Sequence, residues 1–314
     1  MVASAPTAER SAAALVHTKT LMAIRSLEMR ARIVVQGFWN GLHRSPYHGF
    51  SVEFTEYRHY TPGDDPRHLD WRLYARSDRY YIKKFEDETN LRCHLLVDNS
   101  RSMGFSTLDH TKSNYANTLA ATLAWFLFQQ GDATGLMTFD EAIRDYLPPK
   151  ARSSHLRQIM IALERPASGV ATDLNAPLKR AAELVRRRGL IVLISDLLAP
   201  LENLERSLGM LSAGGHEVIL FQVLDPAEVS FNFPKASMFE DLETQQQFYV
   251  DPEFARRGYQ ERLAAHHAAL DQICDRHGIQ RHLLTTDRPL ELALFDFMRS
   301  RQTRKRAIRR KTSR

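Results

Sequence analysis

The sequence predicts an α/β protein built on a doubly wound, mostly parallel β-sheet. From Leu91 to Met298, short apolar segments alternate with segments of helical spacing. This alternation is typical of parallel sheets whose strands are joined by helices. Two apolar segments, Cys93–Val97 and Leu190–Ile194, contain no polar alternation. They are expected to be strands buried on both faces, as in a sheet that is covered by helices on both sides.

The remaining elements follow in chain order from periodicity and turn residues. Strands are expected where β-forming or apolar runs are short: Tyr80–Phe85, Ala133–Phe139 with a hairpin through Tyr146, Glu217–Leu224 and Gln280–Thr285. Helices are expected where apolar residues recur at helical spacing or a capping residue precedes them: Thr18–Trp39 with a break near Gly37, Thr111–Gln130, Ser153–Leu163, Asp173–Arg188, Leu201–Leu211, Asp251–His277 and Leu290–Met298. An aromatic and acidic insert, Phe231–Val250, is expected to serve as packing or as a lid.

Composition divides the chain into four segments. These are a disordered N-terminus (1–17), a helix with a β-rich charged cassette (18–90), the α/β domain (91–298) and a basic tail (299–314). The tail holds nine Lys and Arg residues and no acidic residue, so the rest of the chain carries a net charge of −3 against +6 for the whole. A solvated end is the favoured interpretation of the tail, because no aromatic platform or groove-reading motif indicates specific nucleic-acid binding. Whether 45–90 folds as a separate domain stays open.

Several classes of protein are not expected. No apolar run is long enough to span a membrane, and the N-terminus lacks the apolar core of a secretion signal, so a cytoplasmic protein is expected. Cys93 and Cys274 are expected to be buried, reduced thiols. The chain has no phosphate-binding loop, dinucleotide fingerprint or nucleophile elbow. We therefore expect neither an enzyme nor a small-molecule substrate.

The strongest local signal follows the first buried strand. Asp98, Ser100 and Ser102 form an Asp-x-Ser-x-Ser turn at its end, and ligands of open parallel sheets collect beyond the carboxyl ends of strands. One carboxylate and two hydroxyls are hard oxygen donors, which suit Mg²⁺, Mn²⁺ or Ca²⁺ and suit zinc poorly.

Two further residues extend this ligand set. Thr172 stands at the start of a predicted helix, and Asp196 follows the second buried strand. Five oxygen ligands from three strand ends could surround one octahedral cation and leave a position open for a partner's carboxylate. The alternative is that Thr172 only caps its helix and Asp196 only ends its strand.

This pattern resembles the metal-ion-dependent adhesion site of von Willebrand A domains. The resemblance implies a von Willebrand A-like fold in which Ser100, Ser102 and Thr172 contact the metal through their hydroxyls. It also implies that Asp98 and Asp196 hold the metal directly or through water. Asp173, directly after Thr172, is a departure from the pattern of that site.

The upstream cassette resembles a bacterial family, domain of unknown function fifty-eight. The resemblance rests on Glu53–Asp65, followed by Arg67, Asp70–Arg72 and Arg76. Members are commonly encoded beside MoxR-type AAA+ ATPases, so the resemblance implies an ATPase, or its client protein, as partner. Many members carry N-terminal membrane helices, which this sequence lacks.

The charged residues of the cassette have two interpretations. Four arginines alternate with acidic residues around a Pro-Gly turn: Arg58, Arg67, Arg72 and Arg76 among Glu56, Asp64, Asp65 and Asp70. They could form a buried ion-pair network that fixes the loop, which we favour slightly, or a docking surface for the partner.

The leading hypothesis is a metal-dependent protein-binding module, and two alternatives stay open. One is a Mg²⁺-dependent phosphohydrolase with Asp98 as nucleophile. It usually requires a second Asp two positions on, where Ser100 stands, and a lysine near the site, which is not evident next to Asp196. The other is a structural protein whose metal is purely stabilising.

Overall fold

The computed structural model describes most of the chain. The described residues are 16–44, 57–59, 81–83, 91–166, 174–233, 235, 237–240 and 246–312, with the backbone alone for 41–44, 57–59, 81–83, 237 and 302–312. The chain divides into two compact units, of which unit 1 is Met1–Gly41 with Leu91–Arg314 and unit 2 is Leu42–Asn90. In unit 2, β1 (Tyr57–His59) pairs antiparallel with β2 (Tyr81–Lys83), so the strand expected near Tyr80–Phe85 is confirmed.

Unit 1 is built on a six-stranded sheet in the order β10-β7-β6-β3-β4-β5. The strands are β3 (Arg92–Asp98), β4 (Ala133–Phe139), β5 (Ile143–Lys150), β6 (Leu190–Ser195), β7 (Glu217–Leu224) and β10 (Gln280–Thr285). All neighbours pair parallel except β5, which pairs antiparallel with β4 through the expected hairpin. The order reverses direction next to β3, so the predicted α/β class with a doubly wound, mostly parallel sheet is confirmed.

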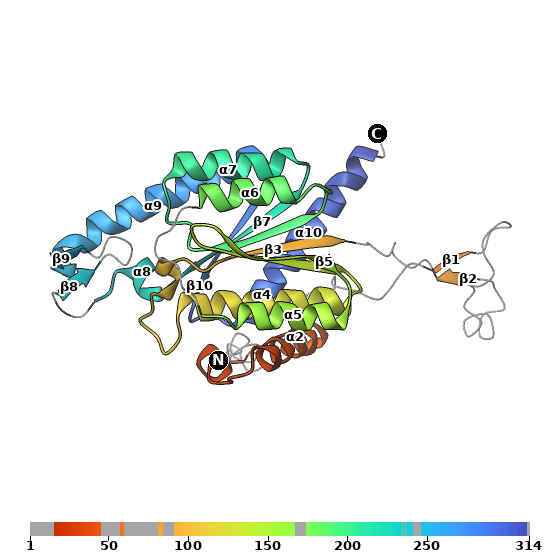
Figure 1. The fold of residues 1–314 in the computed structure, drawn as a ribbon, viewed down its shortest axis with the longest axis horizontal. Coiled ribbons are helices and arrows are strands. Elements are labelled where there is room, and N and C mark those ends of the chain that lie inside the picture. The colour runs from red at the N-terminus through yellow and green to blue at the C-terminus, as the bar shows by residue number, and fades with distance from the viewer. Residues whose placement is uncertain are drawn as a thin grey trace, which may run out of the picture. The chain divides into compact units, whose positions relative to one another are not determined.

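Helices cover both faces of this sheet (Figure 1). The helices of unit 1 are α1 (Thr18–Met22), α2 (Leu27–Arg44, which runs past the unit boundary), η3 (Arg101–Gly104), α4 (Lys112–Gln129), α5 (Ser153–Leu163), α6 (Asn175–Leu184), α7 (Leu201–Ala213), α8 (Pro226–Ser230), α9 (Pro252–His277) and α10 (Leu290–Thr312). One face packs against α6, α7 and α9, where Leu193 and Leu220 of the sheet meet Leu208 and Leu270 in one apolar cluster. The other face carries α4, α5 and α10.

Up to Gly41, helix α2 belongs to unit 1, whereas the expected segment 18–90 groups it with the cassette. Ala31, Val34 and Phe38 of α2 are fully buried. The Phe38 ring lies 5.6 Å from that of Phe126 in α4 and 4.7 Å from that of Phe295 in α10. Aromatic pairs at these distances contribute beyond their buried area, so the helix packs with the α/β unit.

Three helices differ from their expected bounds. The helix expected over Thr18–Trp39 is divided into α1 and α2 at 23–26, and α2 continues through Gly37, where a break is expected, to Arg44. The last helix continues past Met298 to Thr312, because 299–312 contains no Gly or Pro and is rich in Arg and Lys, which are good helix formers. Helix α6 ends at Leu184, since Val185 leaves the helical conformation (φ −85°, ψ 81°).

The aromatic insert forms a small hairpin of β8 (Ser237–Glu240) and β9 (Gln247–Val250). Phe231 stacks on Phe239 and on Tyr259, so part of the insert serves as packing. Phe248 and Tyr249 are exposed.

Two smaller expectations concern the cysteines and membrane-spanning helices. Cys93 and Cys274 are both free and buried, as predicted. In the described part of the chain, no helix is both long and apolar enough to cross a membrane.

Candidate metal centre

The carboxyl ends of β3 and β6 bring two of the predicted ligands to one place. The strands are parallel neighbours, with Val97 opposite Ile194, so Asp98 and Asp196 leave the sheet at adjacent positions. Asn99 then donates its backbone N–H to the carbonyl of Phe139 in β4 (2.7 Å). This bond fixes the start of the Asp98–Ser102 loop against the next strand.

Asp98 is a fully buried carboxylate held by neutral donors. Its Oδ1 accepts from the backbone N–H of Ser100 (2.9 Å), and its Oδ2 accepts from the hydroxyl of Ser195 (2.6 Å). Burial, and next the charge of Asp196, raise the pKa of Asp98 to about 6. No Lys, Arg or His among the described residues forms an ion pair with Asp98, so a bound cation would find an uncompensated carboxylate here.

The two serines of the motif lie side by side. The Oγ atoms of Ser100 and Ser102 are 3.1 Å apart. Ser100 is fully buried, whereas Ser102 is half-buried at the rim of the loop. The two hydroxyls therefore lie within hydrogen-bonding distance of each other, and Ser102 is partly exposed to solvent.

Asp196 already has a cationic partner, which corrects one expectation. The ammonium of Lys112 lies 2.9 Å from Oδ2 of Asp196 and 2.7 Å from Oε1 of Glu228 in α8. The expectation that no lysine lies near Asp196 was therefore wrong. The two residues are distant in sequence, and only the packing of α4 against the end of β6 brings them together.

The position of Lys112 is electrostatically costly without these carboxylates. It is the first residue of α4, where the helix dipole disfavours a cation, and its side chain is 1% exposed. Burial opposes the charged form, but Asp196 and Glu228 together raise the pKa of Lys112 above its ordinary value. The signal that sequence reasoning missed was a lysine placed directly after the helix cap Thr111.

The other predicted residues cannot be placed beside this cluster. Thr172, Arg67, Arg72 and Arg76 lie outside the described residues, and of Arg58 only the backbone in β1 is described. Their roles therefore stay predictions.

The donors that are described fit a hard divalent cation. In the described ranges, no group of three or more His, Cys, Asp or Glu side chains could hold a metal ion. A site here would therefore depend on hydroxyls, which Ser100 and Ser102 supply beside the carboxylate of Asp98. Oxygen donors of this kind are the ligands that Mg²⁺, Mn²⁺ and Ca²⁺ prefer.

Comparison with known proteins agrees with the family resemblance. The family described as "Protein of unknown function DUF58" matches residues 56–269. This chain belongs to that family. An uncharacterized protein of Mycobacterium tuberculosis is 30% identical to the DUF58 chain over 311 residues, covering 94% of this chain and 97% of that protein. One of Mycobacterium bovis is similar to the same extent.

Two solved structures are also similar to this DUF58 protein. The conserved hypothetical protein BatB from Bacteroides thetaiotaomicron has 13% identity and a TM-score of 0.45, covering 69% of this chain and 98% of that chain. The VWA domain of SpRpn10 has 13% identity and a TM-score of 0.41, covering 65% of this chain and 93% of that chain.

Proposed function

We propose that this chain is a divalent-metal-dependent protein-binding module. The observation that carries the proposal is the convergence of Asp98, Ser100, Ser102 and Asp196 at one edge of the sheet. When bound, a divalent ion would supply a Lewis-acidic position that can accept a carboxylate from a partner. Ser100 and Ser102 would hold it through their hydroxyls, and Thr172 is proposed as the third hydroxyl ligand.

The charges of the cluster support a cation rather than an anion. The cluster holds three carboxylates, those of Asp98, Asp196 and Glu228, and one ammonium, that of Lys112, which pairs with Asp196 and Glu228. The cluster therefore keeps an excess of negative charge when all four groups are ionised. Buried charges without a partner are strongly disfavoured, and a divalent ion would relieve this excess while leaving the ion pair of Lys112 in place.

We propose a MoxR-type AAA+ ATPase, or its client protein, as the partner that supplies the acidic residue. This rests on the family to which the chain belongs and on the open coordination position expected at the site. The arginines of the cassette are a second proposed contact. The expected cytoplasmic location stays a prediction that cell fractionation would test.

A pull-down from native lysate tests the function. Wild type, Ser100→Ala/Ser102→Ala and a control are each compared with Mg²⁺ and with EDTA. The control Ser153→Ala/Ser154→Ala removes two exposed hydroxyls at the start of α5. The proposal expects a AAA+ ATPase to be retained by wild type and by the control with Mg²⁺ only.

If the ATPase is retained equally with EDTA and by the Ser100/Ser102 variant, the proposal is contradicted. The contact would then lie elsewhere, and the cassette with Arg67, Arg72 and Arg76 would be the first candidate. If EDTA then lowered only the melting temperature, the metal would have a purely structural role.

Lys112 gives the phosphohydrolase alternative one observation in its favour, since that reaction type uses a lysine near the nucleophile. Against it, Ser100 stands where a second Asp is expected, and both oxygens of Asp98 accept hydrogen bonds within a fully buried site. Release of phosphate from p-nitrophenyl phosphate with Mg²⁺, abolished by Asp98→Asn, would favour the enzyme.

A further inference from the structure

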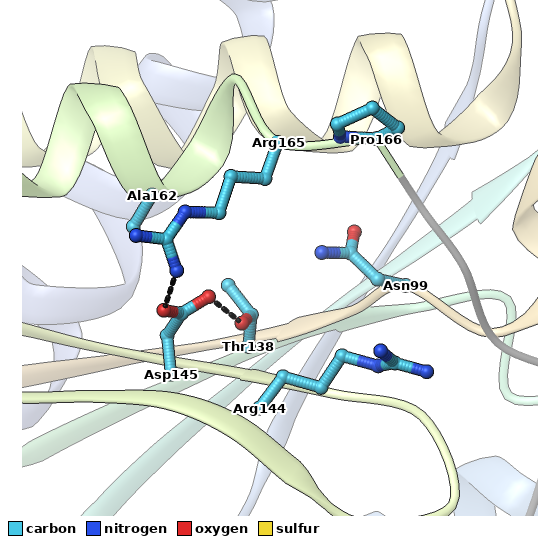
Figure 2. A pocket seen from close by; sticks show the side chains of 7 residues that line it. All are labelled: Asn99, Thr138, Arg144, Asp145, Ala162, Arg165 and Pro166. Atoms are coloured by element: carbon cyan, nitrogen blue, oxygen red, sulfur yellow. Dashed lines mark hydrogen bonds and ion pairs between the residues drawn. The ribbon is translucent and has the colours of Figure 1, made fainter.

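A cavity of about 220 Å³ lies on the other side of the Asp98–Ser102 loop, away from β6. Its walls come from the loop after β3, from β4 and β5, and from the end of α5 (Figure 2). The lining residues used in the argument are Asn99, Thr138, Arg144, Asp145 and Arg165. None of these residues belongs to the proposed metal ligands.

Asn99 points into this cavity with an unsatisfied acceptor. The residue is 6% exposed, and within the described part of the chain its Oδ1 has no hydrogen-bond partner. Figure 2 shows the amide group of Asn99 with its nitrogen toward the space between Arg165 and Arg144 and its oxygen toward Pro166, which also lines the cavity. A buried polar atom without a partner is costly, so a ligand that donates a hydrogen bond would relieve this cost.

Arg144 and Arg165 line the same cavity, and each forms an ion pair with one aspartate. Arg165 donates to Oδ1 of Asp145 (2.6 Å), whose Oδ2 accepts from Thr138 (2.9 Å). Arg144 donates through Nε to Asp140. Asp140 is buried and Asp145 is partly buried, whereas the side chains of Arg144 and Arg165 are 42% and 63% exposed. A guanidinium has five N–H groups, so each arginine keeps donors for an anionic ligand.

The geometry points to a ligand that carries an anion and an N–H donor on neighbouring atoms. We propose that this cavity binds the C-terminal carboxylate of a peptide, with the last backbone N–H donating to Oδ1 of Asn99. In a chain end, the carboxylate and this N–H are attached to the same carbon, so both fit a small cavity. Arg144 and Arg165 contact the carboxylate, the anion that a guanidinium matches in shape. That the peptide belongs to a protein partner rests on the proposed function.

Small-molecule probes test separately whether the ligand needs the carboxylate and whether it needs the N–H donor. The full chain, labelled with ¹⁵N-arginine and kept in EDTA at constant ionic strength, is titrated with N-acetylglycine while the Nε–H signals are followed by NMR. N-acetylsarcosine lacks the N–H, N-acetylglycinamide lacks the carboxylate, and N-acetylaspartate diamide places the carboxylate on a side chain. Inorganic phosphate is a further probe. Arg165→Gln assigns the signal, and Arg157→Gln, at an exposed position of α5, is the matched control.

The proposal expects saturable shifts of Arg144 and Arg165 with N-acetylglycine, with a dissociation constant in the roughly millimolar range. N-acetylsarcosine should bind about three- to tenfold more weakly, as for one lost hydrogen bond, and N-acetylglycinamide should not bind. Arg165→Gln should abolish saturation, and Arg157→Gln should not.

Three outcomes would overturn the proposal. They are no saturable shift with N-acetylglycine, equal binding of N-acetylglycinamide, or preference for phosphate or the aspartate side chain over N-acetylglycine. Because EDTA is present throughout, a positive result stands even if the metal-dependent function fails, and a negative result leaves that function unaffected.

Discussion

At the scale of single residues, the two aspartates of the candidate metal centre differ. Asp196 shares the ammonium of Lys112 with Glu228, whereas Asp98 is held by the neutral groups of Ser100 and Ser195. The uncompensated charge therefore lies on the β3 side of the cluster. Lys112 fixes the orientation of Asp196, so its removal should affect both stability and metal affinity.

Lys112→Met should lower the free energy of unfolding in EDTA by about 3–5 kcal/mol, because it leaves two buried carboxylates without their cation. The same change should strengthen Mn²⁺ binding by about tenfold or more, since a like charge is removed from the site. Chemical denaturation and calorimetric titration measure the two effects. Lys179→Met, at an exposed position of α6, is the control. Weaker Mn²⁺ binding in a folded Lys112→Met protein would contradict this account.

His94 in β3 should make the protein sensitive to acid. Burial, and next the nearby His216, lower the pKa of His94 to about 4, against about 6.5 in an unfolded chain. The unfolded state therefore binds more protons between these values. Stability should fall as the pH falls from about 6.5 to about 4, by up to about 3 kcal/mol from this group.

The check is the pH dependence of urea unfolding for wild type and His94→Gln. The variant should lose part of the slope between pH 6.5 and 4, and His17→Gln, at an exposed position, should keep it. An unchanged slope in His94→Gln would show that His94 is not the source.

At the scale of elements, α8 connects the site to the rest of the fold. Asp225 caps this short helix by accepting from the N–H of Ala227 (2.8 Å), and Oε2 of Glu228 accepts from the N–H of Asp225 (2.8 Å). Asp225 also accepts from the N–H and the hydroxyl of Thr107, in the loop before α4. The cap therefore orders the helix that presents Glu228 to Lys112.

Asp225→Ala should lower the free energy of unfolding by about 2 kcal/mol or more, because it removes a cap and leaves the donors of Thr107 unsatisfied. Asp251→Ala is a matched change, since Asp251 caps α9 through one bond to the N–H of Glu253 (3.0 Å) at an exposed site. It should cost about 0.5–1 kcal/mol. Equal losses, measured by urea unfolding, would show that the Thr107 contacts contribute nothing.

At the scale of the whole molecule, the sheet could be predicted because its signal is local. Leu190–Ile194 is apolar throughout and Cys93–Val97 is apolar except for His94, and their parallel pairing follows from the helices between them. The same logic placed Asp98 and Asp196 at one edge. The fold class and the proximity of Asp98 and Asp196 could therefore be predicted without knowledge of distant contacts.

The parts that escaped prediction depend on tertiary packing. Lys112 is an ordinary residue in sequence, and only the approach of α4 to β6 and α8 makes it a buried ion-pair partner. The cavity with Asn99 likewise needs the end of α5 beside the turn of β4 and β5. The attachment of α2 to unit 1 rests on Phe38, whose ring partners lie far along the chain.

Asp98, Ser100 and Ser102 are proposed to hold a divalent cation, and calorimetric titration of the metal-free protein with Mn²⁺ and Mg²⁺ measures this binding. One bound ion per chain is expected in wild type and in Ser153→Ala/Ser154→Ala, with affinity lost in Ser100→Ala/Ser102→Ala. No saturable binding in folded wild type, or equal binding in the Ser100/Ser102 variant, would contradict this proposal.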